Sequence, residues 1–233
     1  MSVIALENLA EEIAACRMCP RLVAYREDLA VKKRASFMDW TYWARGVPGF
    51  GDPNARVLVI GLAPGAHGAN RTGRVFTGDA SGKFLWKGLH EAGFASQPTS
   101  DHIDDGLVLN DLYVNAALRC VPPQDKPSAD ELSNCRPFLA REIGLLPEVR
   151  LVLALGRVGF EAFIRFASEA SQKRLRLPFK HGEVYEMGEG LPSVLCCFHP
   201  SPRNTNTGKL KYADLVDVLH QARALAGLPP IQG

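Results

Sequence analysis

The sequence predicts an α/β protein, a three-layer α/β/α sandwich with a central four-stranded parallel sheet. Four short apolar runs alternate with segments of helical periodicity, and two of these runs lead directly into loops of glycine, proline and polar residues. Near-continuous apolar runs are typical of parallel strands covered on both faces. Alternation of strands and helices places helices on both sides of such a sheet. The predicted strands are Val57 to Leu62, Leu112 to Leu118, Leu151 to Leu155 and Val194 to Phe198.

The helical segments between the strands have recognisable ends. Ser81 is a candidate N-cap for a helix that Gly93 can close in a left-handed conformation. Ser128 and Glu131 form a capping box for the next helix, which we expect Pro137 to kink or restart. The remaining two helices are expected over Val158 to Phe166 and over a final apolar stripe of Leu215, Val218, Leu219, Ala222 and Leu225, ended by Gly227 and Pro229.

Length and composition favour a single domain, residues 1–233, with an N-terminal appendage of about residues 1–53. The chain has 233 residues, of which 46% are hydrophobic, enough to bury a full core. No run approaches the roughly 20 apolar residues of a membrane span, and the first residues do not resemble a secretory leader. We therefore expect a cytoplasmic, monomeric protein without a membrane partner.

The net charge of the chain does not indicate a partner, but its basic residues are clustered. A net charge of +2 is too small to indicate a nucleic-acid-binding protein by composition. Basic residues gather in the N-terminal fifth and again at Lys173, Arg174, Arg176 and Lys180. Such clusters are as compatible with solvated surface as with phosphate contacts.

Four of the six cysteines have the spacing of a metal or cluster site. Cys16 and Cys19 form a CxxC motif, Cys120 follows the second predicted strand, and Cys135 lies fifteen positions later. Disulfides are disfavoured in a cytosolic chain, and four thiolates suit either an iron–sulfur cluster or a tetrahedral zinc. The other two cysteines are neighbours in the last predicted strand, so their side chains point to opposite faces and cannot share one metal.

The loop after the first strand is suited to a flat ligand. The small residues at and beyond Gly61 let the backbone approach closely, but the loop matches neither the GxGxxG fingerprint nor the P-loop pattern. Phe76 can stack on a planar ligand. Asn115, at the end of the second strand, offers both a donor and an acceptor, as the edge of a pyrimidine requires.

The loop after the last strand combines a histidine with a rigid backbone. His199 stands at the mouth of the strand, and the loop continues through Ser201, Pro202, Arg203 and Asn204. These residues can contact phosphates or fill the gap left by an extruded nucleotide. Because ligands of open α/β sheets bind outside the carboxyl ends of the strands, we expect both loops to face one site.

Together these motifs resemble the family 5 uracil-DNA glycosylases, the iron–sulfur branch called type B. The resemblance is carried by GLAPGAHGANRTGRVFTGD, NAALRC, HPSPRN and the four spaced cysteines, and it runs from about Cys16 to the last helix. It implies a DNA repair enzyme that flips uracil, hypoxanthine or xanthine out of DNA and hydrolyses the N-glycosidic bond, leaving an abasic site. A non-catalytic protein of the same fold that binds damaged DNA or abasic sites is the alternative.

The resemblance also implies roles for individual residues. The backbone of Gly61, Leu62 and Ala63 and the side chain of Asn115 would bind the base, and Phe76 would stack on it. His199 would stabilise the negative charge of the departing base, and the HPSPRN loop would be the wedge. The ligands of a four-iron four-sulfur (4Fe-4S) cluster would be Cys16, Cys19, Cys120 and Cys135.

The similar family 4 enzymes carry an acidic residue in the first motif, where this chain has Leu62 and Ala63. Without that carboxylate, the rate must come chiefly from stabilising the transition state and from positioning water. Asn70, together with Asn115, is the first candidate to orient this water. Asp79 is the second candidate, because its surroundings are typical of a turn and helix cap.

Overall fold

Four parallel strands form the centre of the sheet, as predicted. The structure is a computed structural model that describes residues 2–188 and 190–231. The parallel strands occur in the spatial order β3 (Leu112–Ala116), β2 (Val57–Gly61), β4 (Leu151–Leu155) and β6 (Ser193–Cys197). Every residue of β2, β3 and β4 is buried, which accounts for their continuous apolar sequences.

Two short antiparallel strands at the edges extend the sheet to six and were not predicted. β1 (Phe50–Gly51) pairs with β3, and β5 (Val184–Tyr185) pairs with β6. A two-residue strand is too short to show the alternation of apolar and polar residues by which a strand is recognised in a sequence.

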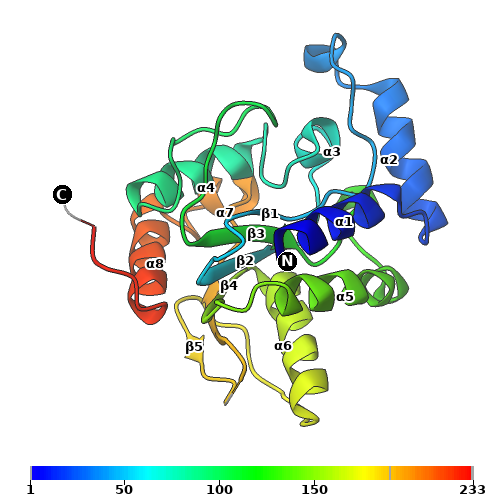
Figure 1. The fold of residues 1–233 in the computed structure, drawn as a ribbon. Helices are drawn as coiled ribbons and strands as arrows, with labels where there is room; N and C mark the ends of the chain where they lie inside the picture. The colour runs from blue at the N-terminus through cyan, green and yellow to red at the C-terminus, as the bar shows by residue number, and fades with distance from the viewer. Residues whose placement is uncertain (1, 189, 232–233) are drawn as a thin grey trace.

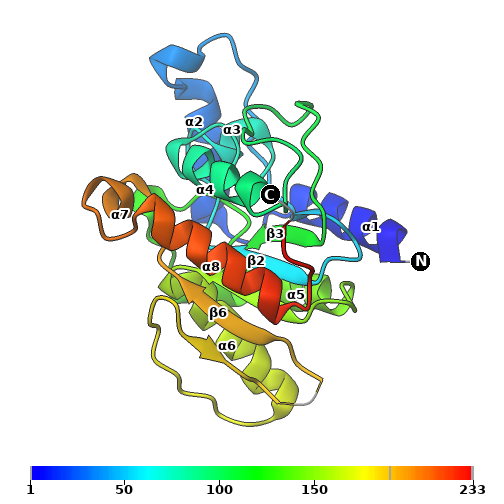
Figure 2. The same cartoon turned by 90° about the vertical axis from the view of Figure 1, so that its left-hand side faces the viewer.

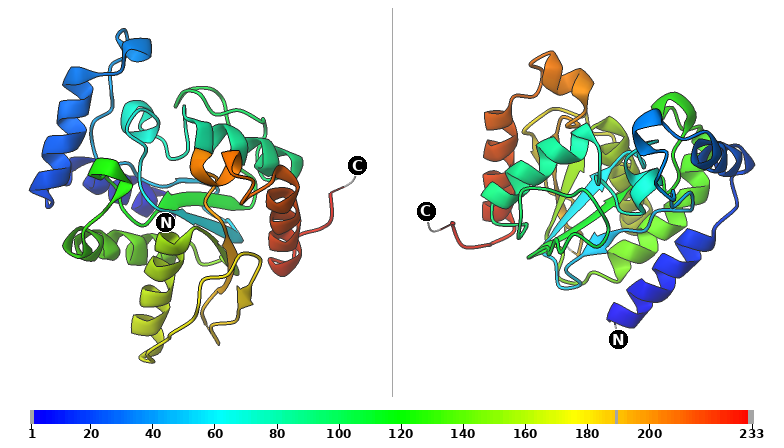
Figure 3. Two further views of the ribbon diagram at one scale, coloured as in Figure 1. Left: turned by 180° about the vertical axis from the view of Figure 1, so that it is seen from behind. Right: turned by 90° about the horizontal axis from the view of Figure 1, so that it is seen from above.

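Helices cover both faces of the sheet, so the predicted three layers are confirmed (Figures 1 and 3). α4 (Ala80–Glu91) and α8 (Tyr212–Leu225) pack on one face, where Trp86 and Leu219 contribute to the core with Val59. α5 (Ala129–Gly144) and α6 (Arg157–Ser171) pack on the other face, where Leu139 and Phe163 join Leu58 and Ile60.

The helix ends follow the predicted chemistry with two differences. The N-cap of α4 is Asp79 rather than Ser81, since the Asp79 carboxylate accepts a hydrogen bond from the Gly82 amide at 2.8 Å. Gly93 is left-handed, with φ at +67°, and the capping box of α5 is present. Pro137 does not end α5, which runs on to Gly144 because its buried face packs against the sheet.

The limits of two other helices also differ from the prediction. α6 extends beyond Val158 to Phe166 at both ends, to Arg157–Ser171. In α8 the predicted stripe is buried except for Leu225, which is 43% exposed at the last position of the helix. Apolar spacing therefore identified the helices but not where each one stops.

The N-terminal segment consists of α1 (Ser2–Ala15) and α2 (Pro20–Lys32), joined at the CxxC motif. α1 packs against α5 through Leu9, Ile13 and Phe138, and α2 lies on the outside of the molecule, next to α3 (Ala69–Thr72), in Figures 1 and 2. The other short helical segments are η1 (Ala35–Phe37), η2 (Pro123–Asp125) and α7 (Pro202–Asn206). Within residues 2–188 and 190–231, we find no helix with the length and hydropathy that crossing a membrane requires.

Candidate active site at the carboxyl edge of the sheet

The carboxyl ends of β2, β4 and β6 bring the glycines and His199 together. Gly156 directly follows β4 with φ at +87°, and a Cβ built on it would lie 3.1 Å from the Cβ of His199. The Gly156 amide donates to the carbonyl of Cys197 at 2.8 Å. Glycine at this position thus lets the backbone that carries His199 lie against the end of β4.

Phe76 connects the first loop to His199. A Cβ built on Gly61 would lie 2.8 Å from the Phe76 ring, so the ring packs directly on the end of β2. The centroids of the Phe76 and His199 rings are 5.8 Å apart, at an interplanar angle of 34°. The loop after the first parallel strand and the loop after the last one therefore meet, as the sequence predicted.

The backbone of Phe76 is held in an unfavourable conformation. Its φ is +51°, in the left-handed region that bulky residues rarely adopt. The indole nitrogen of Trp86 donates to the Phe76 carbonyl at 2.6 Å, which ties this residue to α4. Such strain is kept only where the surroundings over-determine it, and it is concentrated at functional sites.

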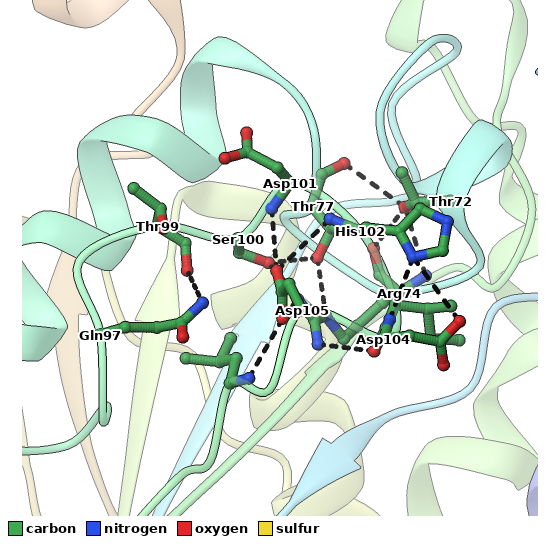
Figure 4. A network of polar contacts seen from close by, with 12 residues as sticks. Thr72, Arg74, Thr77, Gln97, Thr99, Ser100, Asp101, His102, Asp104 and Asp105 are labelled. Carbon is green, nitrogen blue, oxygen red and sulfur yellow. Dashed lines mark hydrogen bonds and ion pairs between the residues drawn. The ribbon is translucent and has the colours of Figure 1, made fainter.

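A buried network around Arg74 holds the segment that carries Phe76 (Figure 4). The Arg74 guanidinium donates to both carboxylate oxygens of Asp105 at 2.7 and 2.8 Å, to Ser100 at 2.8 Å and to Thr77 at 3.0 Å. Burial raises the pKa of Asp105, but hydrogen bonds led by that from Arg74 keep it below its usual value. Sequence analysis missed this network because its partners lie 26 and 31 positions from Arg74 and share no local motif.

Asp79 places a carboxylate at the glycine turn. One oxygen, Oδ1, caps α4, while the other, Oδ2, would lie 2.8 Å from a Cβ on Gly65 and 2.0 Å from one on Gly68. A side chain at either glycine would therefore clash with this carboxylate. Burial raises the pKa of Asp79 above its usual value.

Asn70 lies away from this group of residues. It is fully buried, and its amide nitrogen donates to the carbonyl of Arg26 in α2 at 3.2 Å. Among the described residues, its Oδ1 atom has no hydrogen-bond partner. The structure thus gives Asn70 contacts between the first loop and α2, and does not bring it to His199 or Asn115.

Asn115 is buried on the face of the sheet that α5 covers. Its amide nitrogen donates to Glu142 at 2.7 Å, and Glu142 also accepts from Arg119 at 2.5 Å and from the Gly49 amide at 3.1 Å. Phe76 packs with the core cluster on the opposite face. The structure therefore does not place the Asn115 side chain against Phe76, although its Oδ1 is buried without a partner in the described part of the chain.

Glu142 is a site neighbour that sequence analysis did not identify. It is 1% exposed, yet it stands on an apolar face of α5 beside Leu139 and Ile143. A carboxylate on an apolar helix face was the available signal, because a buried charge requires partners.

His199 is partly buried, and its surroundings favour the neutral imidazole. Burial lowers the pKa of His199 to about 4, so the ring is uncharged at neutral pH. The amide nitrogen of Asn204 donates to the carbonyl of His199 at 2.8 Å. The predicted loop is therefore short: Ser201 is the N-cap residue of α7, and Pro202, Arg203 and Asn204 form the first turn of this helix because Pro202 suits its first position. Pro202 and Arg203 are exposed.

The first loop contacts the cysteine region through Ala63. The carbonyls of Gly61 and Leu62 accept hydrogen bonds from the amides of Ala117 and Leu118, both at 3.0 Å, which extends the pairing beyond β2. Ala63 packs against the cluster formed by Leu22, Leu118, Cys120 and Cys135. The base-binding candidates and the cysteines are therefore adjacent.

The four spaced cysteines approach one another from three segments. Cys120 and Cys135 are buried together, with Cys19 packed against them, and Cys16 lies at the end of α1. Three of the sulfur atoms accept N–H groups: Cys120 from Arg26 at 2.9 Å, Cys135 from the Arg119 amide at 3.5 Å and Cys19 from Asn134 at 3.5 Å. In residues 2–188 and 190–231, no three Cys, His, Asp or Glu side chains are arranged to hold a metal ion.

Comparison with known families gives a match that covers most of the chain. The family described as the uracil DNA glycosylase superfamily matches residues 48–223. The matched range contains both loops and the whole sheet.

Individual relatives extend this similarity to the N-terminal segment. The chain is 50% identical to the type-5 uracil-DNA glycosylase of Thermus thermophilus over 222 residues, 95% of this chain and 99% of the relative. It is 42% identical to the type-5 enzyme of Pyrobaculum aerophilum over 221 residues, 95% and 93% of the two chains. Similarity to the type-4 uracil-DNA glycosylase of Sulfurisphaera tokodaii is lower, with 28% identity over 153 residues, 65% and 54% of the two chains.

Proposed function

The chain belongs to the uracil DNA glycosylase superfamily, and on this premise we propose that it is a type-5 uracil-DNA glycosylase. Such an enzyme hydrolyses the N-glycosidic bond of uracil in DNA and leaves an abasic site. The observation that carries the proposal is the contact between Phe76 and His199 beside Gly61. It provides an aromatic face for a flipped base and a neutral imidazole in one place.

We further propose that His199 stabilises the departing base. A uracil that leaves as an anion needs a hydrogen-bond donor, and a neutral imidazole still donates through the one ring nitrogen that carries hydrogen. Preorganised donors aimed at developing charge are a major source of catalysis. The lowered pKa of His199 and the hydrogen bond that fixes its carbonyl support this role.

For the attacking water we propose Asp79 rather than Asn70. The Asp79 carboxylate stands at Gly65 and Gly68, at the entrance of the first loop, whereas the Asn70 amide is buried toward α2. A carboxylate whose pKa is raised by burial is also a better proton acceptor for water than an ordinary aspartate. In the proposed mechanism the acidic group of the first motif is therefore Asp79, the last residue of GLAPGAHGANRTGRVFTGD.

Asn115 remains our candidate for reading the base edge. Its amide nitrogen is fixed by Glu142, which determines the orientation of the carboxamide. The Oδ1 atom is then left as an acceptor for the N3–H group of uracil, and a buried acceptor without a partner calls for such a ligand. Breadth toward hypoxanthine and xanthine is part of the proposal, because a single acceptor discriminates little between these rings.

We propose that Cys16, Cys19, Cys120 and Cys135 hold a 4Fe-4S cluster. The donor set is all sulfur, and three of the sulfurs accept N–H groups, as cluster thiolates do. Four thiolates also suit a tetrahedral zinc, and the iron and zinc content of the purified protein distinguishes the two. Bound there, the cluster would join α1 and α2 to β3 and α5.

Duplex DNA is the proposed partner, with residues 201–204, the N-cap and first turn of α7, as the wedge. Pro202 and Arg203 are exposed there, while Asn204 donates to the carbonyl of His199 and so serves as a positioning residue. Flipping a base requires a group that occupies the vacated space in the duplex.

The direct test uses labelled duplexes that carry uracil, hypoxanthine, xanthine or no damaged base, incubated with the protein and then cleaved with alkali. We expect strand cleavage at uracil and at the two deaminated purines, and none in the undamaged duplex. Tight binding of the damaged duplex without cleavage would reject the enzyme and favour a non-catalytic protein that binds abasic or damaged sites.

A further inference from the structure

We propose that the segment Lys173–Lys180, here called the basic segment, is a phosphate-binding track that extends the DNA contact beyond the wedge. The proposal rests on the function proposed above, in that it takes DNA as the partner. The basic segment leaves the end of α6 and returns to the sheet at β5 (Figure 2).

The basic segment has two sides, one partly buried and one exposed. Leu175, Leu177 and Phe179 are partly buried and pack against the core cluster under α6. The residues that alternate with them, Arg174, Arg176, Pro178 and Lys180, are exposed. Every second residue therefore faces outward, as in a strand. In a strand, alternate residues lie about 7 Å apart.

One end of the basic segment is fixed beside the catalytic loop. His181 stacks on Phe198, the residue before His199, with ring centroids 4.7 Å apart and an interplanar angle of 11°. The His181 ring nitrogen accepts from the Phe198 amide at 3.2 Å, and Phe179 packs on Phe198 at 6.1 Å. The cation of Lys209, in turn, lies 4.6 Å over the Phe198 ring, so basic groups continue on both sides of the site.

The cations of this surface are available to a ligand. Within residues 2–188 and 190–231, no carboxylate pairs with Arg165, Lys173, Arg174, Arg176 or Lys180. Two acidic residues of α6 that line this surface are paired with other arginines, Glu169 with Arg136 and Glu161 with Arg157. A surface hollow of about 650 Å³ lies between α6 and the basic segment, lined by these arginines and Lys173.

The dimensions suit a DNA backbone better than a compact anion. The six steps from Arg174 to Lys180 span at most about 20 Å, the length of a fully extended chain. Duplex DNA carries about one charge per 1.7 Å, so this length faces about six base pairs. Because Phe179 and His181 contact Phe198, the end of the track at Lys180 is the part nearest to His199.

The test compares the salt dependence of DNA binding in matched variants of the full-length, cluster-loaded protein. The double variant Arg174→Ala/Arg176→Ala removes two proposed contacts. We expect the slope of log K against log salt on a 30-base-pair duplex to fall in magnitude by about 1.8, and affinity near 150 mM salt to fall roughly tenfold or more. Single-turnover excision of uracil at saturating protein should stay within about twofold, and excision from a five-nucleotide strand should not change.

A second pair of variants separates local contacts from net charge. Arg176→Glu and Arg150→Glu change the net charge equally, but Arg150 is exposed at the amino-terminal edge of the sheet. Only Arg176→Glu should weaken binding strongly. An unchanged slope in the double variant, or equal losses in the two Glu variants, would overturn the track and favour an acidic protein as the partner of this surface. Failure of the wild-type protein to excise uracil would instead count against the proposed function, whatever the slopes.

Discussion

Replacement of Asp79 separates its structural role from its proposed chemical one. Its Oδ1 caps α4, and its Oδ2 stands at the glycine turn where we place the attacking water. Asparagine is as good an N-cap as aspartate, whereas alanine lacks the capping oxygen. Asp79→Asn therefore keeps the cap and removes the carboxylate, and Asp79→Ala removes both.

The expected magnitudes follow from these two roles. Loss of the cap costs about 1 kcal/mol, or a melting temperature lower by about 2 to 4 °C in a chain of this size, and only in Asp79→Ala. Loss of the proton acceptor lowers the rate by about 10²- to 10⁴-fold in both variants. Burial raises the pKa of Asp79, so the wild-type rate should fall on the acid side at a pH above the ordinary aspartate value of 3.8, where the carboxylate becomes protonated.

The assay is single-turnover excision from a uracil-containing duplex across pH, with thermal unfolding measured on the same preparations. The acid limb due to Asp79 should be absent in Asp79→Asn. If Asp79→Asn excises uracil within about threefold of the wild-type rate, the water is oriented by another group and our reasoning on Asp79 is refuted.

Three further predictions concern the leaving group, the buried carboxylate and the cluster. His199→Ala should lower excision by at least about tenfold while duplex binding persists, because one transition-state contact is lost; equal single-turnover rates would contradict this. Glu142→Ala should destabilise the fold by about 3 to 5 kcal/mol, since it leaves the buried guanidinium of Arg119 unpaired; calorimetry should show a melting temperature lower by about 6 to 20 °C, and a shift below 2 °C would disprove it. Cys120→Ser should lose the visible absorption and iron of protein purified without oxygen, whereas Cys196→Ser, in β6, should keep both; stoichiometric zinc in the wild type would exclude the cluster.

Matched controls distinguish these effects from general damage. Glu148 is exposed just beyond α5, so Glu148→Ala should change stability by no more than about 0.5 kcal/mol.

The pH dependence of stability gives an independent check on His199. Its pKa is lowered to about 4 by burial, so the unfolded chain binds more protons between about pH 4 and 6.5, and stability should fall as the pH falls through this window. His199→Ala should reduce that slope.

Local sequence predicted much of the secondary structure because the signals were local. Apolar runs located the four parallel strands, and Ser128 with Glu131 located the start of α5, since each depends on residues within a few positions. The cap of α4 was assigned to Ser81 instead of Asp79 because both residue types are good caps, and only the hydrogen bond to Gly82 distinguishes them.

The candidate site was predictable in its location and less so in its details. The convergence of Phe76 and His199 follows from parallel strands with loops at the same edge, which the sequence pattern already implied. The direction of the Asn115 side chain does not follow, because it depends on which face of β3 meets Glu142, 27 positions away. Asn70 and Asp79 are likewise distinguished by contacts with Arg26 and with Gly68, not by their motifs.

By itself, the amino-acid sequence determined the layers, the parallel centre of the sheet, the two facing loops and the likeness to uracil-DNA glycosylases. Those features depend on periodicity and on motifs of a few adjacent residues. Only the tertiary structure showed what each polar group contacts: Asp79 caps α4 beside the glycine turn, and Asn70 donates to Arg26 in α2. The physical reason is that a buried polar group is paired with atoms distant in sequence, and its partner is set by packing.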